Sequence, residues 1–111
     1  MQTLQQQQVF RIEEIERKDC LLEISSYKYC RAILGSIRDK PRSIIEITSE
    51  TNISMSTAYR RVQNLHDSKL LRISGTITDE GKILFMYKSK FKRIQSRYSN
   101  GKTEVNLIHN N

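Results

Sequence analysis

The stretch ISMSTAYRRVQNLHDSKLL, residues 53–71, decides the fold of this 111-residue chain. Ser54 stands where a helix N-cap is expected, because its hydroxyl can accept a backbone N–H of the first turn. The apolar side chains that follow recur at helical spacing: Ala58, Val62 and Leu65. The stretch therefore predicts a capped helix with small, hydroxyl-bearing residues at its front and the tandem Arg60-Arg61 behind them.

Two shorter helices are predicted before this one. The first would begin after Ser25 and Ser26, which can both act as N-caps. It would end before Pro41, since the residue preceding a proline is pushed out of the helical region. Its core-facing stripe has helical spacing: Cys30, Ile33, Leu34 and Ile37.

The second of these helices has a defined start and end. Ser43 and Glu46 have the spacing of a capping box, in which each side chain accepts a backbone N–H from the other residue. Ile44 and Ile47 would point inward from this helix. Asn52 follows, and asparagine tolerates the left-handed conformation that a tight turn between two helices requires.

The residues after the arginine-bearing helix predict two β-hairpins. The segment 70–90 reads LLRISGTITDEGKILFMYKSK and places the turn sequence TDEG between two β-prone runs. A second pair of runs, over 92–108, flanks Asn100-Gly101, a strong hairpin signal. The fold class is therefore α+β, with helices first and antiparallel hairpins after them.

The N-terminal part of the chain is less patterned. Residues 1–8 (MQTLQQQQ) are polar and glutamine-rich, so we expect disorder there. Residues 9–24 mix apolar and charged side chains, and we expect a helix, with Glu13, Glu14 and Glu16 on an exposed face.

Between Ile47 and Leu65 the chain resembles the winged helix-turn-helix family of transcription regulators. The matching positions are Ile47-Thr48, the turn Asn52-Ile53, the run 54–62, and Leu65. The resemblance covers residues 26–90 and looks closest to small archaeal regulators of the ArsR-like or MarR-like kind. It implies a three-helix core plus a β-hairpin wing, here with an extra C-terminal β-hairpin and an N-terminal helix.

This organisation divides the chain into three parts. They are an N-terminal extension, partly disordered or helical (1–24), the winged helix-turn-helix domain (25–90), and a C-terminal β-hairpin and tail (91–111). The net charge of +7 is concentrated at the end of the chain, where residues 81–111 carry seven basic groups against Glu104 alone. Such an excess suggests a polyanion as partner, although a basic surface can also serve solubility.

The predicted function is sequence-specific DNA binding, with the helix over 54–67 in the major groove. The N-terminal end of such a helix approaches base edges, so small residues there permit close contact. We expect these residues to contact DNA: Ser54, Met55, Ser56, Thr57, Tyr59, Arg60, Arg61, Gln63, Asn64 and Lys82. Arg60 is the best candidate for base readout, because a guanidinium can bond guanine through two hydrogen bonds. Arg61 and Asn64 lie toward a flank and would contact the DNA backbone.

The wing departs from the family's pattern at its tip. Asp79 and Glu80 stand where the resembling regulators often carry basic groups, and both would repel phosphate. Lys82 lies just behind them. Two interpretations of the wing are therefore open. Either the wing contacts DNA through Lys82, or it faces away from DNA.

The resemblance also implies a homodimer on a pseudo-palindromic site, and the segments 9–24 and 91–108 are the candidate dimer surfaces. A different reading is a winged-helix module that binds another protein within a transcription or repair assembly. The acidic wing tip would favour that reading.

Other classes of function find little support. We expect no enzyme, because no nucleophile elbow, phosphate loop or carboxylate pair is visible. We expect no cofactor and no metal site, since Cys20, Cys30, His66 and His109 lack ligand spacing. No small-molecule ligand is evident. Two cysteines, no leader and no long apolar run favour a cytoplasmic protein that does not enter a membrane.

Overall fold

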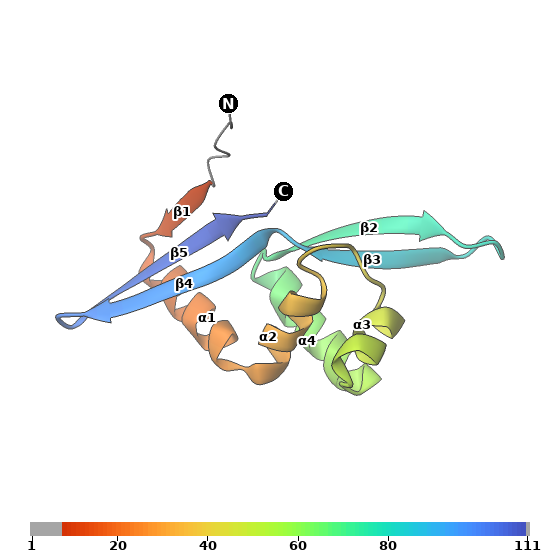
Figure 1. The fold of residues 1–111 in the computed structure, drawn as a ribbon, viewed down its shortest axis with the longest axis horizontal. Helices are drawn as coiled ribbons and strands as arrows, with labels where there is room; N and C mark the ends of the chain where they lie inside the picture. Colours follow the sequence, from red (N-terminus) through yellow and green to blue (C-terminus); the bar gives the residue numbers. More distant parts are fainter. Residues whose placement is uncertain (1–7, 111) are drawn as a thin grey trace, which may run out of the picture.

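The computed structural model describes residues 8–110 of the chain. The helices lie on one side of the molecule and the strands on the other (Figure 1). In chain order the elements are β1 (Val9–Ile12), α1 (Ile15–Ser26), α2 (Lys28–Ser36), α3 (Ile44–Thr51), α4 (Met55–Asp67), β2 (Leu71–Ile77), β3 (Ile83–Ser89), β4 (Phe91–Ser99) and β5 (Lys102–His109). The expected disorder over 1–8 concerns residues that, apart from Gln8, lie outside this range.

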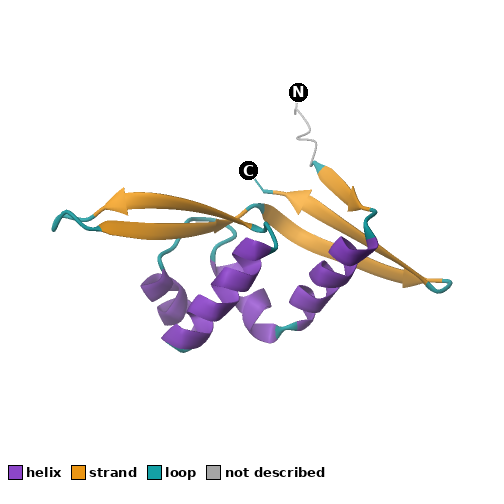
Figure 2. Ribbon diagram, turned by 180° about the vertical axis from the view of Figure 1, so that it is seen from behind, coloured by secondary structure: helices purple, strands orange, loops and turns teal. Residues whose placement is uncertain are grey.

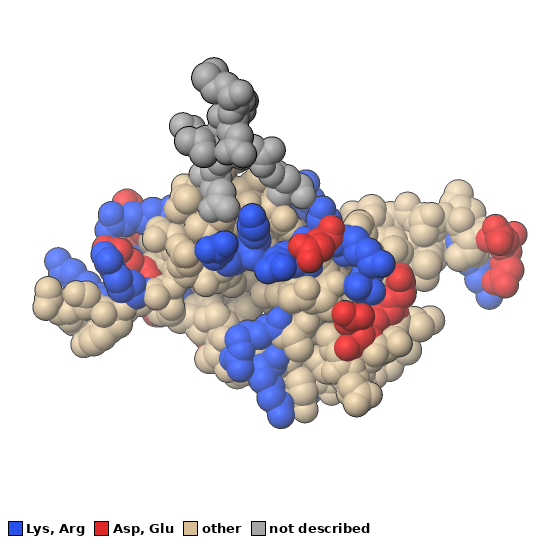
Figure 3. All heavy atoms as spheres, in the orientation of Figure 1, with Lys and Arg blue, Asp and Glu red and all other residues tan. Residues whose placement is uncertain are grey.

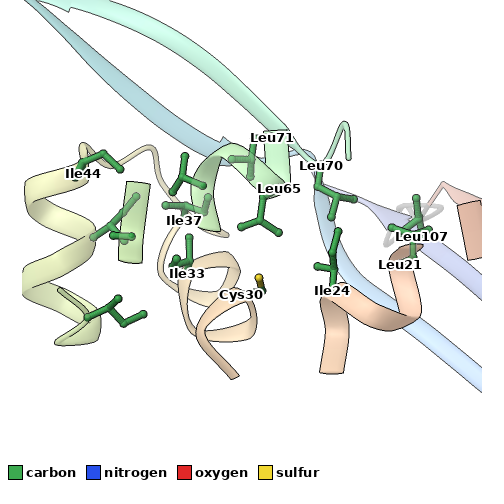
Figure 4. Close-up of a cluster of buried hydrophobic side chains, with 14 of the residues drawn as sticks. Leu21, Ile24, Cys30, Ile33, Ile37, Ile44, Leu65, Leu70, Leu71 and Leu107 are labelled. Carbon is green, nitrogen blue, oxygen red and sulfur yellow. The ribbon is translucent and has the colours of Figure 1, made fainter. Parts of the chain in front are cut away.

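Helices α2, α3 and α4 pack together through the apolar faces that the sequence predicted. Figure 4 shows this cluster of buried side chains, which also includes residues of α1 and β5. The side chains of α2 and α4 at its centre are fully or almost fully buried: Cys30, Ile33, Ala58, Val62 and Leu65. The helical spacing of these residues is therefore confirmed, because each faces the common core.

The start of α3 confirms the predicted capping box. The Ser43 hydroxyl accepts the Glu46 N–H at 3.3 Å, and the Glu46 carboxylate accepts the Ser43 N–H at 3.1 Å. Asn52 ends the helix with φ at 60°, in the left-handed region. Helix α3 therefore turns into α4 over only a few residues, which is the helix-turn-helix geometry.

Helix α4 ends next to Lys69, whose left-handed backbone conformation is one that residues other than glycine seldom adopt. Ser68 is the C-cap, and Lys69 has φ at 61°, where glycine is favoured. Leu70 is buried directly after it, so the side chain that leaves the helix enters the core at once. The strained Lys69 fixes the direction in which the chain leaves α4 toward β2.

The two predicted hairpins are both present. Strands β2 and β3 pair along their whole length. Leu71 lies opposite Ser89 at the base, and Ile77 lies opposite Ile83 near the tip. In the β4–β5 hairpin, Asn100 and Gly101 both have positive φ, as a type I′ turn requires. Figure 2 shows the two hairpins extending to opposite ends of the molecule.

A single residue, Lys90, separates β3 from β4. Its N–H donates to the Leu70 carbonyl at 2.8 Å, and its carbonyl accepts the Asn110 N–H at 2.9 Å. A bulge follows between Phe91 and Arg93. Lys88 therefore lies in β3 and Lys92 in β4, with Lys90 in the link between the two strands.

The helix predicted over 9–24 is wrong in its first part. Val9–Ile12 is the strand β1, which pairs with β5 in a sheet of order β1-β5-β4. Phe10 lies opposite Leu107 and Ile12 opposite Val105, so these two side chains share the face of β5 that contacts the core, and Ile12 packs against it. The strand forms because β5 supplies hydrogen-bond partners, a non-local effect that no short window of sequence contains.

The predicted capping by Ser25 and Ser26 is also wrong. Both serines complete the last turn of α1, where their hydroxyls donate to the carbonyls of Leu22 and Glu23, three residues earlier. Helix α2 begins after Tyr27 without a side-chain cap. None of the helices between residues 8 and 110 is long and apolar enough to cross a membrane.

Candidate nucleic-acid interface

The front of α4 is held by its own hydroxyl groups. The Ser54 hydroxyl accepts the Thr57 N–H at 3.4 Å and donates to the Thr57 hydroxyl at 3.0 Å. Ser54 and Thr57 are therefore partly committed to the cap. Ser56 stays exposed beside them, so it is the hydroxyl of this end that is most available to a ligand.

The outer face of α4 is open to solvent along its whole length. Tyr59 is 55% exposed and Met55 is 45% exposed, although both are large apolar or aromatic residues. The other exposed candidates on this helix are Ser56, Arg60, Gln63 and Asn64. No described element covers this face, which is the arrangement that a helix needs in order to enter a groove.

The two arginines of α4 have different surroundings. Arg60 is exposed, and its guanidinium makes no ion pair or hydrogen bond within residues 8–110. Arg61 is half-buried, and its guanidinium lies over the Tyr27 ring, with Cζ 4.8 Å from the ring centroid. The pair therefore separates into a free cation on the outer face and a packed cation at the junction of α1 and α2.

Gln63 and Asn64 complete the candidate set on this helix. The Gln63 amide donates to the Asp67 carboxylate at 2.8 Å, so it must release that bond or share it in order to contact a base. Asn64 is exposed at the flank of the helix.

The base of the wing lies next to α4. Tyr87 of β3 bonds Arg42 through both backbone groups, with N···O distances of 2.8 and 3.0 Å, and this anchors the wing to the segment before α3. Burial raises the pKa of the Tyr87 hydroxyl, and the neighbouring Tyr59 raises it further. The wing strand and the outer face of α4 are therefore close at this point, which the sequence did not reveal.

The wing tip is acidic and exposed, as the sequence predicted. Asp79 and Glu80 form the turn with Gly81, whose φ is 79°. Lys82 is exposed next to them, and its N–H donates to the Thr78 hydroxyl at 3.1 Å. Figure 3 shows acidic side chains at the wing end of the molecule, on the right, and basic side chains gathered over its middle.

The two cysteines have no ligand partners. Cys30 is buried in the core, and this burial raises the pKa of its thiol. Cys20 is half-buried, and its Sγ lies 3.4 Å from the Ser68 hydroxyl. Within residues 8–110, no three His, Cys, Asp or Glu side chains are grouped so that they could hold a metal ion.

Two solved structures share this fold. NolR from Sinorhizobium fredii superposes with a TM-score of 0.55 over 67% of this chain and 69% of its own length, at 16% identity. A protein from Methanosarcina mazei Go1, described as a possible transcriptional regulator, gives 0.53 over 82% of this chain and 76% of its own, at 18% identity. No family model and no curated protein matches the chain in sequence. At these identities the likeness shows the winged-helix fold.

Proposed function

We propose that this chain is a transcription regulator that binds DNA by inserting α4 into the major groove. The observation that carries the proposal is the uncovered outer face of α4, on which Arg60 projects free of any protein partner within residues 8–110. The described function of the Methanosarcina mazei relative in fold supports the same reading. The mechanism is occupancy of a site by binding in the cytoplasm, without catalysis.

The parts of the interface would have separate tasks. Arg60 reads a base edge, because its guanidinium can donate two hydrogen bonds to guanine. Ser56 and the free N–H groups at the start of α4 hold a phosphate. Lys82 contacts the backbone at the wing, while Asp79 and Glu80 weaken that contact by like-charge repulsion.

A homodimer is part of the proposal. Strand β4 has one edge without a pairing strand within residues 8–110, and so has β1, because the sheet order is β1-β5-β4. Such an edge can pair with its copy across a two-fold axis. Two copies would then read half-sites about one helical turn apart.

Selection of bound sites from a random duplex pool tests the proposal. We expect an enriched, two-fold-symmetric site, and a log affinity that falls steeply with log salt because several phosphates are neutralised. A pool without enrichment, together with salt-independent binding, would reject the proposal.

A second candidate function rests on the wing. Ile77 is 75% exposed, Ile83 67% and Phe85 56%, and the strand register places all three on one face. Contiguous exposed apolar side chains often mark a protein contact, and the tip beside them is acidic. The chain would then hold another protein in a transcription or repair assembly.

One double variant separates the two candidate functions. The variant with both Phe85→Ser and Ile77→Ser loses apolar surface from the wing but leaves α4 unchanged. We expect this double variant to bind the selected duplex as tightly as the wild type. Loss of capture of a partner protein, with no enriched duplex for the wild type, would favour the second candidate instead.

A further inference from the structure

A cleft lies between α2 and β4, outside the proposed DNA interface. It has a volume of about 240 Å³. Four apolar side chains line it: Leu34, Leu70, Phe91 and Ile94. Four cationic residues border it as well: Arg31, Arg38, Lys92 and Arg93. None of the lining residues is Asp or Glu, so the cleft combines apolar surface with a concentrated positive charge.

The cations are only partly neutralised by the protein. The Arg38 guanidinium lies 3.2 Å from the Asp39 carboxylate, but both side chains are more than half exposed, so this pair is weak. Arg31 donates to the Ser25 carbonyl at 2.9 Å, which carries no net charge. Lys92 and Arg93 make no side-chain ion pair within residues 8–110. Neighbouring cations repel one another, and a bound anion would relieve that repulsion.

The β-bulge lies where four consecutive residues of β4 border the cleft. In a regular strand successive side chains point to opposite faces, so only every second residue could line one cavity. Here Phe91, Lys92, Arg93 and Ile94 all line it, and the bulge lies between Phe91 and Arg93. A bulge of this kind can redirect a side chain at a functional site, and it brings apolar and cationic groups together here.

Gly35 on α2 is a separate observation that favours a ligand at the α2 side of the cleft. A Cβ at this position would meet no heavy atom within 4 Å, and its φ lies outside the left-handed region. Neither packing nor turn geometry therefore requires glycine, although glycine weakens a helix relative to alanine. A ligand that approaches the helix backbone closely would account for it.

We propose that this cleft binds a small amphipathic organic anion, with a hydrocarbon body on the apolar side chains and a carboxylate or phosphate head among the cations. The apolar lining supplies affinity, and a few charged groups fix the orientation, as in other small-molecule sites. The cleft is smaller than the roughly 300 Å³ at which sites for drug-sized ligands begin, so a short body fits it. Binding here does not rest on the proposed DNA-binding function, and its test uses no DNA.

The test is calorimetric titration of the full chain with four probes. Octanoate and octyl phosphate carry both features and distinguish the two head groups, while 1-octanol lacks the charge and acetate lacks the body. We expect saturable 1:1 binding of at least one amphiphilic anion, and binding of octanol and acetate weaker by about tenfold or more. Equal binding of octanol, equal binding of acetate, or no binding of either amphiphile would overturn the proposal.

Two variants locate the site. A Cβ at Gly35 meets no heavy atom within 4 Å, so we expect Gly35→Leu to occupy part of the cleft. It should weaken binding by about tenfold or more while the thermal unfolding midpoint stays the same or rises. Unchanged binding in this folded variant would overturn the proposal. If Gly35→Leu fails to fold, amide shifts on titration of the wild type decide: shifts around Leu34 and Phe91 support the site, and shifts elsewhere refute it.

Charge is tested with a matched control. Lys92→Glu with Arg93→Glu should weaken binding by about tenfold or more, while Arg72→Glu with Lys102→Glu, which changes the net charge equally on other surfaces, should not. Equal losses from both pairs would show a general charge effect and overturn the proposal. Unchanged binding of the amphiphilic anion by the variant with Lys92→Glu and Arg93→Glu would overturn the proposal as well.

Discussion

The Arg61 guanidinium stacks on the Tyr27 ring, with Cζ 4.8 Å from the ring centroid, and so ties α4 to the residue that separates α1 from α2. The Nε of Arg61 is buried and has no hydrogen-bond partner within residues 8–110. The cation–π contact with the ring offsets part of the cost of burying this cation. Although its neighbour Arg60 projects freely, Arg61 is partly a structural residue.

This contact predicts a coupling between the two side chains. Arg61→Ala should lower the free energy of unfolding by about 1 kcal/mol, and a double-mutant cycle with Tyr27→Ala should give a coupling of about 0.5–1 kcal/mol. Tyr27→Phe is the control, because it keeps the ring and loses only the hydrogen bond to Glu23. Additive effects of Arg61→Ala and Tyr27→Ala in denaturant unfolding would show that the stacking contributes nothing.

Arg60 should govern sequence preference without affecting stability. Arg60→Ala should cost about 1–3 kcal/mol on the selected duplex and little on random duplex, because one bidentate base contact is lost. Arg61→Ala should instead weaken binding to both duplexes to a similar degree. Fluorescence anisotropy at one fixed salt concentration measures both variants. If Arg60→Ala binds the selected site like the wild type, the outer face of α4 is not the reading surface.

The capping box of α3 predicts a pH dependence of stability. The backbone hydrogen bond from Ser43 lowers the pKa of the Glu46 carboxyl in the folded state. A lowered pKa means that the stabilisation is fully present above the unfolded pKa of roughly 4.3 and is lost as the pH falls through the folded value. Glu46→Gln should therefore show a shallower loss of stability on acidification than the wild type, in unfolding curves taken from pH 7 down to pH 3.

Ser43→Ala is the companion variant to this experiment. It removes the other half of the box and should cost about 1 kcal/mol at neutral pH, since an N-cap hydroxyl is lost. Identical acid limbs for the wild type and Glu46→Gln would mean that the reciprocal bond is not maintained in solution.

Lys69 offers a stabilising substitution. Its φ of 61° is strained for a residue with a Cβ, by about 1 kcal/mol. Lys69→Gly removes this strain at some cost in unfolded-state entropy, so the net gain should be about 0.5 kcal/mol and the thermal midpoint should rise. Lys69→Ala keeps the strain and serves as the control. Equal midpoints for the glycine and alanine variants would contradict the argument.

Much of the fold could be predicted because its signals are local. The box of Ser43 and Glu46, the left-handed Asn52, and the turn at Asn100-Gly101 each depend on a few adjacent residues, and all three are confirmed. The spacing of apolar residues in α4 likewise fixed which side would be outward, and Tyr59 and Arg60 are exposed as expected. Whether that outward side contacts DNA is not a local property, and it stays a prediction.

The sequence by itself determined the three helices of the winged core, the caps of α3 and α4, and the two hairpins, since backbone propensity and apolar periodicity act within a turn or a strand. Tertiary structure alone decided that Val9–Ile12 is a strand, because its partner β5 lies at the other end of the chain. It also placed Arg61 on Tyr27 and set the cationic residues of β4 against α2. Such contacts join residues far apart in the chain, and they form only when the whole core closes.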